Sequence, residues 1–314
     1  MFHNFRQCLV RSSGIALLAL TVSSCAMVSV GSVSSEDYLS ARRGDVLTTG
    51  RLSASARTAL QVVGINEARC NSNILACRKA LIASAGLGDE QRLSALSELW
   101  LQEALQYEEA QKLEPVNDTL KAATLSAYLE SARHAYAYLF FTDRTPDLRA
   151  MEDRQAQVRD YYNFSSQQAV VDLFNRYRDQ LEKSVSQAKT YLLDFAPWQV
   201  SGSTAGLSLS HKGQLPNELV AASALTFKGL RNQYRRDGLG AELVAVFASS
   251  VVKQEDENKP WSETPFPSVT VMLRFPGNSI ESVLAGNQVE LQGFDPHKNV
   301  SVDVRGIRVP LAAN

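Results

Sequence analysis

Apolar and polar residues follow two different periods along this chain. Within residues 93–110 apolar side chains recur at three- and four-residue spacing, which is the period of an α-helix buried on one side. Within residues 269–275 valine, leucine and phenylalanine occupy every second position, which is the pattern of a half-buried strand. We therefore predict an α+β protein, with an antiparallel helical bundle at residues 51–196 and an antiparallel β-sandwich-like domain at residues 198–314.

Capping and breaking residues divide the helical part into separate helices. In chain order we predict a helix over 89–114 capped by Asp89, a helix over 117–141 capped by Asn117, a break at Thr145-Pro146-Asp147, and a last helix that Ser165 and Gln168 open as a capping box and Pro197 closes. Tyr107–Pro115 is also similar to the end of a tetratricopeptide repeat. No second copy follows at a fixed period, so a repeat array is the less favoured alternative to simple helical hairpins.

Short stretches rich in strand-forming residues make up the second part of the chain. Turn residues separate them, as Pro276-Gly277-Asn278 does, and the acidic, proline-containing stretch Lys253–Pro267 is predicted to be an exposed loop. The predicted strands are Ser203–Ser210, Leu219–Phe227, Glu242–Ala248, Val269–Phe275, Val289–Leu291, Val300–Val304 and Ile307–Leu311. Their spacing favours the sandwich.

The N-terminus has the features of a bacterial lipoprotein signal. Two arginines precede the apolar run Gly14–Val22, which is shorter than the roughly 20 residues of a spanning helix, and the run ends in the lipobox-like Val22-Ser23-Ser24-Cys25. We predict a signal peptide at residues 1–24, lipidation of Cys25, and a flexible lipidated tether at residues 25–50. An ordinary cleaved signal, or a chance cysteine, is the alternative.

The lipid on Cys25 would place the protein in the cell envelope, facing the periplasm. Ala26 follows the cysteine and favours sorting to the outer membrane of a Gram-negative bacterium. The chain has 32 basic and 33 acidic residues. Without Arg6 and Arg11 of the leader its net charge is −3, which offers no basic field for nucleic acid. The expected partner is the membrane.

Two cysteines remain outside the leader and the anchor, Cys70 and Cys77. An oxidising compartment favours a disulfide between them. In one continuous helix they would lie about 10 Å apart, beyond the reach of a disulfide, but Asn71-Ser72-Asn73 between them predicts a helix break that brings the thiols together. A zinc site is disfavoured because no further ligands lie nearby.

The sequence contains no complete catalytic motif. Gly202–Gly206 has the glycine spacing of a G-x-S-x-G turn but carries Thr204 in the centre, and we expect a turn and strand start there. His134, His211 and His297 are not next to a nucleophile and an acid. Phosphate-loop, dinucleotide and metalloprotease motifs are also lacking. We therefore predict no catalytic residue, no metal and no cofactor.

A basic cluster is the strongest candidate for binding besides the anchor. It consists of Lys228, Arg231, Arg235 and Arg236, next to the glycines of Gly238-Leu239-Gly240. It suits contact with an anion or a lipid headgroup. The alternative is a solvated loop between strands, in which the glycines serve the backbone conformation.

Three segments resemble the N-terminal region of large proteobacterial lipoproteins of the α/β-hydrolase family. These are Phe227–Ala241 (FKGLRNQYRRDGLGA), Phe294–Ala313 with its FDPH and VDVRGIRVPLAA motifs, and Gly64–Cys77. In that family a helical and β-rich front half precedes a lipase- or esterase-like catalytic domain. This chain reaches Asn314, where that domain would begin, so no catalytic residue is carried over.

The resemblance implies a membrane-anchored envelope lipoprotein that forms the accessory, non-catalytic front half of an α/β-hydrolase-like protein. Its expected partner is then a hydrolase domain. The alternative is a stand-alone scaffold or binding lipoprotein that engages another cell-envelope protein. A hydrolase complete in this chain alone is the least favoured reading.

Overall fold

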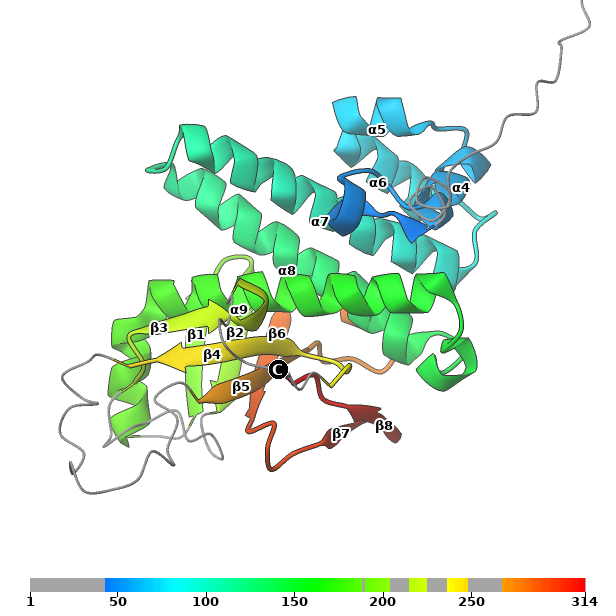
Figure 1. Ribbon diagram of the computed structural model, residues 1–314. Coiled ribbons are helices and arrows are strands. Elements are labelled where there is room, and N and C mark those ends of the chain that lie inside the picture. Colours follow the sequence, from blue (N-terminus) through cyan, green and yellow to red (C-terminus); the bar gives the residue numbers. More distant parts are fainter. Residues whose placement is uncertain (1–42, 188–189, 204–214, 225–235, 248–266, 314) are drawn as a thin grey trace, which may run out of the picture. The chain divides into compact units, whose positions relative to one another are not determined.

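The computed structural model of the protein describes residues 43–187, 190–203, 215–224, 236–247 and 267–313. Cys25, the leader and most of the predicted tether lie outside these residues. So do three members of the basic cluster, His211 and nearly all of the predicted loop over 253–267; their predicted roles stay predictions. The described fold combines a helical N-terminal part with a curled sheet (Figure 1).

The helical part begins before residue 51, inside the predicted tether. The short helix α3 (Val46–Thr49) is capped by Asp45, whose Oδ1 accepts the backbone N–H groups of Leu47 and Thr48. Val46 is buried, so this segment belongs to the folded part. The helices that follow are α4 (Ala54–Val62), α5 (Glu67–Ser72), α6 (Ile74–Ala83), α7 (Asp89–Leu113), α8 (Asp118–Phe141), the short 3₁₀ helix η1 (Pro146–Arg149) and α9 (Asp153–Gln187).

The predicted helical hairpin is confirmed as α7 and α8. Asn117 caps α8, since its Oδ1 accepts the N–H of Leu120 at 3.0 Å. The cap of α7 is Gly88 instead of Asp89, which lies in the first turn, where its carboxylate still favours the positive end of the helix dipole.

The predicted helix start at Ser165 is wrong, because α9 continues through it. Ser165 is fully buried inside α9 and donates to Ser131 Oγ at 3.0 Å, while Ser131 donates to the carbonyl of Ser97 at 2.9 Å. These three serines join α9, α8 and α7. A serine that hydrogen-bonds to a neighbouring helix cannot be told from a helix-capping serine in the sequence, because both roles require a small polar side chain.

Within the described part of the chain, the strands form one six-stranded sheet and a separate two-stranded ribbon. The strands are β1 (Thr190–Phe195), β2 (Trp198–Ser203), β3 (Glu218–Ala221), β4 (Ala241–Val246), β5 (Ser268–Arg274), β6 (Gln288–Phe294), β7 (Ser301–Val304) and β8 (Ile307–Pro310). The sheet order is β1-β2-β6-β5-β4-β3, and β7 pairs with β8. The small helices η2 (Ala222–Ala224) and α11 (Ile280–Ala285) interrupt the strands.

The antiparallel sandwich is not what the described residues form. Strands β2 and β6 run parallel, while the other neighbouring pairs of the sheet are antiparallel. Helix α9 lies along one face of the sheet, where a sandwich would place a second sheet (Figure 1). An apolar strand face fixes neither the direction of its neighbours nor whether a helix or a sheet covers it.

Residues 190–195, predicted to be helical, form the edge strand β1. Leu193 and Phe195 are buried on one side of it, and a turn containing the cis peptide Ala196–Pro197 joins it to β2. Gly202, which the G-x-S-x-G spacing had singled out, lies in β2 opposite Tyr191. It is therefore a strand residue near the end of β2, whereas a turn and strand start was predicted; all but the first residue of the predicted strand Ser203–Ser210 lies outside the described residues.

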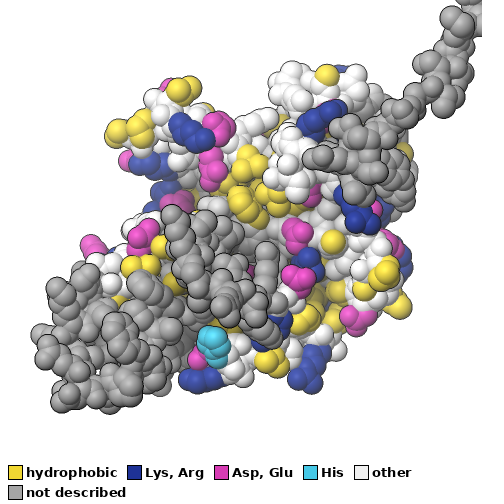
Figure 2. Space-filling view, viewed as in Figure 1, with side chains coloured by type: hydrophobic (Ala, Val, Ile, Leu, Met, Phe, Trp, Pro, Cys, Tyr) yellow, Lys and Arg dark blue, Asp and Glu magenta, His cyan; other side chains and the backbone are white. Residues whose placement is uncertain are grey.

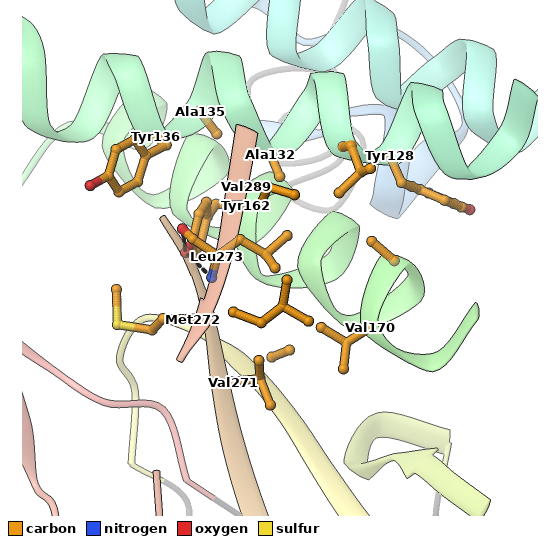
Figure 3. Packing of buried hydrophobic residues seen from close by; sticks show 14 of the residues in the cluster. Tyr128, Ala132, Ala135, Tyr136, Tyr162, Val170, Val271, Met272, Leu273 and Val289 are labelled. Atoms are coloured by element: carbon orange, nitrogen blue, oxygen red, sulfur yellow. Dashed lines mark hydrogen bonds between the residues drawn. The ribbon is translucent and has the colours of Figure 1, made fainter. Parts of the chain in front are cut away.

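Strand β5 lies at the centre of the main core and is buried on both faces. Leu273 and Val271 belong to the core that α8 and α9 share with the sheet, together with Tyr162 and Val170 of α9 (Figure 3). Thr270, on the alternating position, is 1% exposed and donates to the carbonyl of Ala312 at 2.7 Å. The prediction that β5 is half-buried is therefore wrong, because residues 311–313 cover part of its second face.

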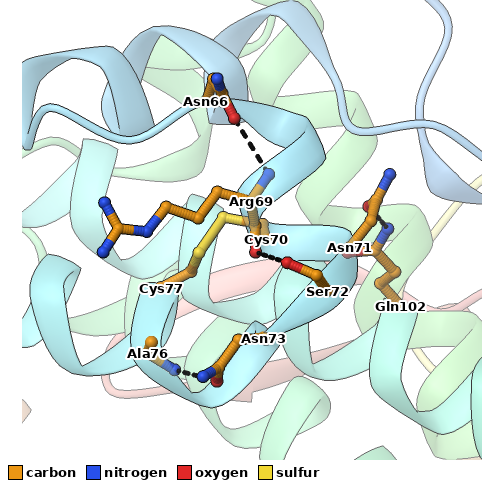
Figure 4. The surroundings of a disulfide bond; sticks show 9 residues. All are labelled: Asn66, Arg69, Cys70, Asn71, Ser72, Asn73, Ala76, Cys77 and Gln102. Carbon is orange, nitrogen blue, oxygen red and sulfur yellow. Dashed lines mark hydrogen bonds between the residues drawn. A yellow bond between two sulfur atoms is a disulfide. The ribbon is translucent and has the colours of Figure 1, made fainter.

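A second, smaller core lies between α4, α5, α6 and the first half of α7. The predicted disulfide Cys70–Cys77 lies within it, with both cysteines fully buried. Asn73 ends α5 and caps α6, since its Oδ1 accepts the N–H of Ala76 at 3.0 Å (Figure 4). The predicted helix break between the cysteines is thus present and brings their Cα atoms to 5.6 Å.

Glu98 of α7 links the segment from Val46 to Ser53 to this core through hydrogen bonds. Its Oε1 accepts the backbone N–H of Val46 at 3.2 Å and of Ser53 at 2.7 Å, and its Oε2 accepts the hydroxyl of Ser53 at 2.7 Å. Glu98 is 1% exposed, and this burial raises its pKa to about 7, with the nearby carboxylate of Asp45 acting in the same direction.

Candidate binding pocket

A pocket of about 230 Å³ lies where the end of α8, η1, the start of α9, residues 237–239 and β8 meet. Its floor is apolar and consists of buried side chains. The floor residues are Leu139, Phe140, Leu239 and Val309. Pro146, Ala150, Ala156, Gly238 and Pro310 are the small residues and prolines among the other lining residues. Because these side chains are short, the floor stays open.

The local sequence explains why the chain opens here. The last turns of α8 are apolar on most sides, and the helix ends at Phe141, after which Pro146 starts η1 with its fixed backbone angle. Gly238 lies against the backbone of Leu311 and Ala312, where a Cβ would meet the carbonyl carbon of Leu311 at 2.4 Å. A glycine is therefore required for residues 237–239 to approach the segment after β8 so closely.

Charged side chains of both signs surround the apolar floor. Asp147, Arg159, Asp237 and Arg308 line the pocket. Arg159 pairs with Asp160 through Nη2 at 3.1 Å, and burial raises the pKa of Asp160. Figure 2 shows the same mixture of signs over the described part of one face of the molecule. A rim with two acids and two bases suits a partner that also carries both signs, as a protein surface does.

Two large apolar side chains are exposed next to the pocket. Leu148 is 70% exposed and Met151 is 99% exposed. They alternate along the chain with Asp147 and Ala150, which line the pocket. Neither side chain lines the pocket itself, but both belong to the segment that forms one of its walls.

Arg236 is the member of the predicted basic cluster that the structure describes, and it has a structural task. Its Nε donates to the carbonyl of Leu311 at 2.8 Å, and its Nη2 donates to the carbonyls of Pro296 and Asn299 at 3.1 and 3.3 Å. Its backbone pairs with Ala313. The guanidinium is thus committed to carbonyl oxygens beside the pocket, which leaves it poorly suited to bind an anion.

The two described histidines differ in environment. His134 is buried in α8, where its Nδ1 lies 2.8 Å from the carbonyl oxygen of Glu130 and its ring lies 6.5 Å from that of Trp100. Burial lowers the pKa of His134 to about 3, and the charges of Arg133 and Arg78 act in the same direction. His134 is therefore a neutral core residue. His297 is exposed in a turn after Asp295.

Among the residues that the structure describes, no helix is both long and apolar enough to cross a membrane. The same residues contain no group of three or more His, Cys, Asp or Glu side chains placed to hold a metal ion. No protein-family profile matches the sequence, and no curated protein or solved structure matches it significantly. The function is therefore inferred from the chain's own residues.

Sequence reasoning did not find the pocket, although it marked two of its walls. The break at Thr145-Pro146-Asp147 and the glycines around Leu239 were both singled out for their backbone properties. Nothing local shows that residues about 90 positions apart meet, with β8 as a third wall. Pairing breaks in helices with glycine-rich strand connections is the signal that could have found it.

Proposed function

We propose that this protein is an envelope lipoprotein, anchored through a lipid on Cys25, that serves as the non-catalytic accessory region of an α/β-hydrolase-like lipase or esterase. The pocket binds the hydrolase-like catalytic part. The leader and lipobox support the anchor, and the disulfide Cys70–Cys77 supports an oxidising compartment such as the periplasm. Ala26 after the cysteine supports the outer membrane.

The pocket is the observation that carries the accessory role. Its apolar floor, mixed-charge rim and exposed Leu148 and Met151 have the composition of a protein-docking site, with an apolar centre inside a polar rim. The state of His134 agrees with this role, because a buried imidazole with a pKa of about 3 is a poor general base near neutral pH.

The stand-alone scaffold is the second candidate, and one observation favours it. Leu113 and Val116 are 86% and 85% exposed at the turn between α7 and α8. This turn belongs to different elements from the pocket and offers a second apolar contact for another envelope protein.

For the anchor, Cys25→Ser is expected to abolish labelling of the protein by a fatty-acid analogue in a Gram-negative host. The protein should then move from the membrane fraction to the soluble periplasmic fraction, because the acyl chains supply the hydrophobic attachment. Cys8→Ser, in the leader, is the matched control and should leave labelling unchanged. Persistent labelling of the Cys25→Ser protein would refute the lipobox assignment.

For the pocket, Leu148→Asp/Met151→Asp is expected to weaken binding of a separately expressed hydrolase-like catalytic part at least about tenfold. The two new charges oppose burial of the apolar surface beside the pocket. Isothermal titration with the full mature chain measures the affinity. A catalytic domain from a lipoprotein of the resembled class is the ligand.

Leu113→Asp/Val116→Asp is the matched control, since it also replaces two exposed apolar residues. It should bind with unchanged affinity. If the control loses affinity and the pocket variant does not, the α7–α8 turn is the contact and the pocket assignment is wrong. If the wild-type chain hydrolyses p-nitrophenyl esters and a serine-reactive phosphonate stops it, the non-catalytic role is wrong.

A further inference from the structure

We propose that the outer surface of α4 and α6 docks on the membrane to which the chain is anchored, with anionic phospholipid as its ligand. This surface, the α6 face, consists of Val62, Leu75, Lys79 and Ile82. The inference rests on the lipid anchor of the proposed function and adds to it a defined membrane-facing side. Figure 1 shows α4, α5 and α6 gathered at one end of α7, away from the sheet.

The α6 face is a continuous stripe. Leu75, Lys79 and Ile82 are spaced four and three residues apart on α6, so they share one side of the helix. Leu75 and Ile82 are 50% and 61% exposed, whereas Ile74, Cys77 and Leu81 on the other side fill the small core.

Val62, at the end of α4, continues the stripe past the end of α6. It is 53% exposed, and its Cγ1 lies 3.7 Å from the position that a Cβ on Gly86 would occupy. Gly86 follows α6 by three residues. Three large aliphatic side chains of α4 and α6 are therefore open to solvent.

Helix α6, which carries most of this stripe, contains basic residues and no acid. Residues 68–88 contain three basic residues and no acid. Arg78 is buried and pairs with Glu103 at 2.6 Å, but Arg69 and Lys79 are exposed and have no ion-pair partner among the residues that the structure describes. Aliphatic side chains next to the unpaired Lys79 match the boundary between the acyl chains and anionic headgroups of a bilayer.

The other exposed apolar pairs of the described chain carry acids instead. Leu113 and Val116 flank Glu114, and Leu148 and Met151 lie next to Asp147 and Glu152. An anionic surface repels these carboxylates. The difference in charge therefore assigns the lipid surface to the α6 face and leaves the Leu148 and Met151 pair for a protein partner.

The anchor keeps the α6 face close to a bilayer. Cys25 lies 18 residues before Arg43, the first described residue, a separation that spans at most about 60 Å at full extension. The folded part then meets the membrane at an effective concentration in the mM range. A surface of three aliphatic side chains and one lysine, whose affinity for lipid is weak, is then largely occupied, and vesicles at millimolar lipid reach the same occupancy without the anchor.

The test uses the mature full-length chain with Cys25→Ser, which carries no lipid. It should co-sediment with vesicles of phosphatidylcholine and phosphatidylglycerol in equal amounts, less so as salt is raised, and not with pure phosphatidylcholine. Leu75→Asp/Ile82→Asp should reduce the bound fraction at least about tenfold at limiting lipid, and Lys79→Glu should reduce it about threefold or more. Leu113→Asp/Val116→Asp is the matched control and should bind as well as the unmodified chain.

Hydrogen exchange on the same vesicles gives a second readout that does not depend on any variant. Amides of residues 74–83 should exchange more slowly with the anionic vesicles present. Unchanged exchange there, or equal binding by the Leu75→Asp/Ile82→Asp protein, would overturn the proposal. Whether Cys25 is lipidated is measured separately, by acyl labelling in cells, because the vesicle experiment contains no acylated protein.

Discussion

Tyr162→Phe is expected to lower the free energy of unfolding by about 2–4 kcal/mol, although it removes a single oxygen atom. Tyr162 of α9 is fully buried. Its hydroxyl donates to the carbonyl of Leu273 at 2.6 Å and accepts the backbone N–H of the same residue at 2.9 Å (Figure 3). Strand β4 begins at Ala241, which pairs with Val271, so no β4 residue lies opposite Leu273. The hydroxyl takes the place of the missing strand neighbour.

Phenylalanine would leave both backbone groups of Leu273 buried without a partner, which is the source of the cost. Urea unfolding followed by circular dichroism measures it. Tyr138→Phe is the matched control, because Tyr138 is also fully buried but its hydroxyl has no hydrogen-bond partner among the described residues. We expect that variant to be as stable as the wild type. Equal loss in both variants would show that the Leu273 contact is not the cause.

Local sequence signals were sufficient to predict the helices that begin at a capping side chain. Asn117 caps the start of α8 with its own side chain. Asn73, between the two cysteines, caps the start of α6 in the same way. These contacts join residues three apart, so the sequence contains both partners. The same locality explains why the strand positions around residues 242 and 270 were close to correct.

Elements whose partners are distant were not predictable in this way. Residues 190–195 suit a helix by their apolar spacing, and only pairing with β2 selects a strand. The parallel neighbour of β2 is β6, about 90 residues further on. The task of Arg236 depends on carbonyls of residues 296, 299 and 311. Its place in the basic cluster gave no sign of these partners, and the pocket, made of three distant segments, had no local signature.

Glu98→Gln is expected to raise the free energy of unfolding above neutral pH by about 3 kcal/mol. Glu98 is buried, and its two oxygens accept two backbone N–H groups and the hydroxyl of Ser53. A glutamine oxygen can still accept the two N–H groups, and its amide can donate to the serine hydroxyl. The substitution therefore keeps the geometry and removes the buried charge, which is the costly part.

The pH dependence follows from the direction of the shift. Burial raises the pKa of Glu98 from 4.5 to about 7 in the folded protein. The folded state therefore binds more protons than the unfolded state between these values, and the contribution of Glu98 to stability is complete below pH 4.5 and is lost as the pH rises through about 7. His134 acts with the opposite sign, because burial lowers its pKa from 6.5 to about 3 and its contribution is lost as the pH falls.

In the wild type, the pH dependences that Glu98 and His134 give to the free energy of unfolding have opposite signs and mask each other. The quantity to measure is therefore the difference in that free energy between the wild type and Glu98→Gln. His134 is common to both proteins and cancels. The difference should be near zero at about pH 4.5 and approach about 3 kcal/mol at about pH 8. Glu109→Gln, an exposed glutamate of the same helix with 71% side-chain exposure, is the control for loss of one charge and should show no such change. A difference for Glu98→Gln that is the same at both pH values would mean that the Glu98 carboxyl does not titrate in this range. The segment from Asp45 to Ser53 would then be held by an ionised carboxylate at every pH tested.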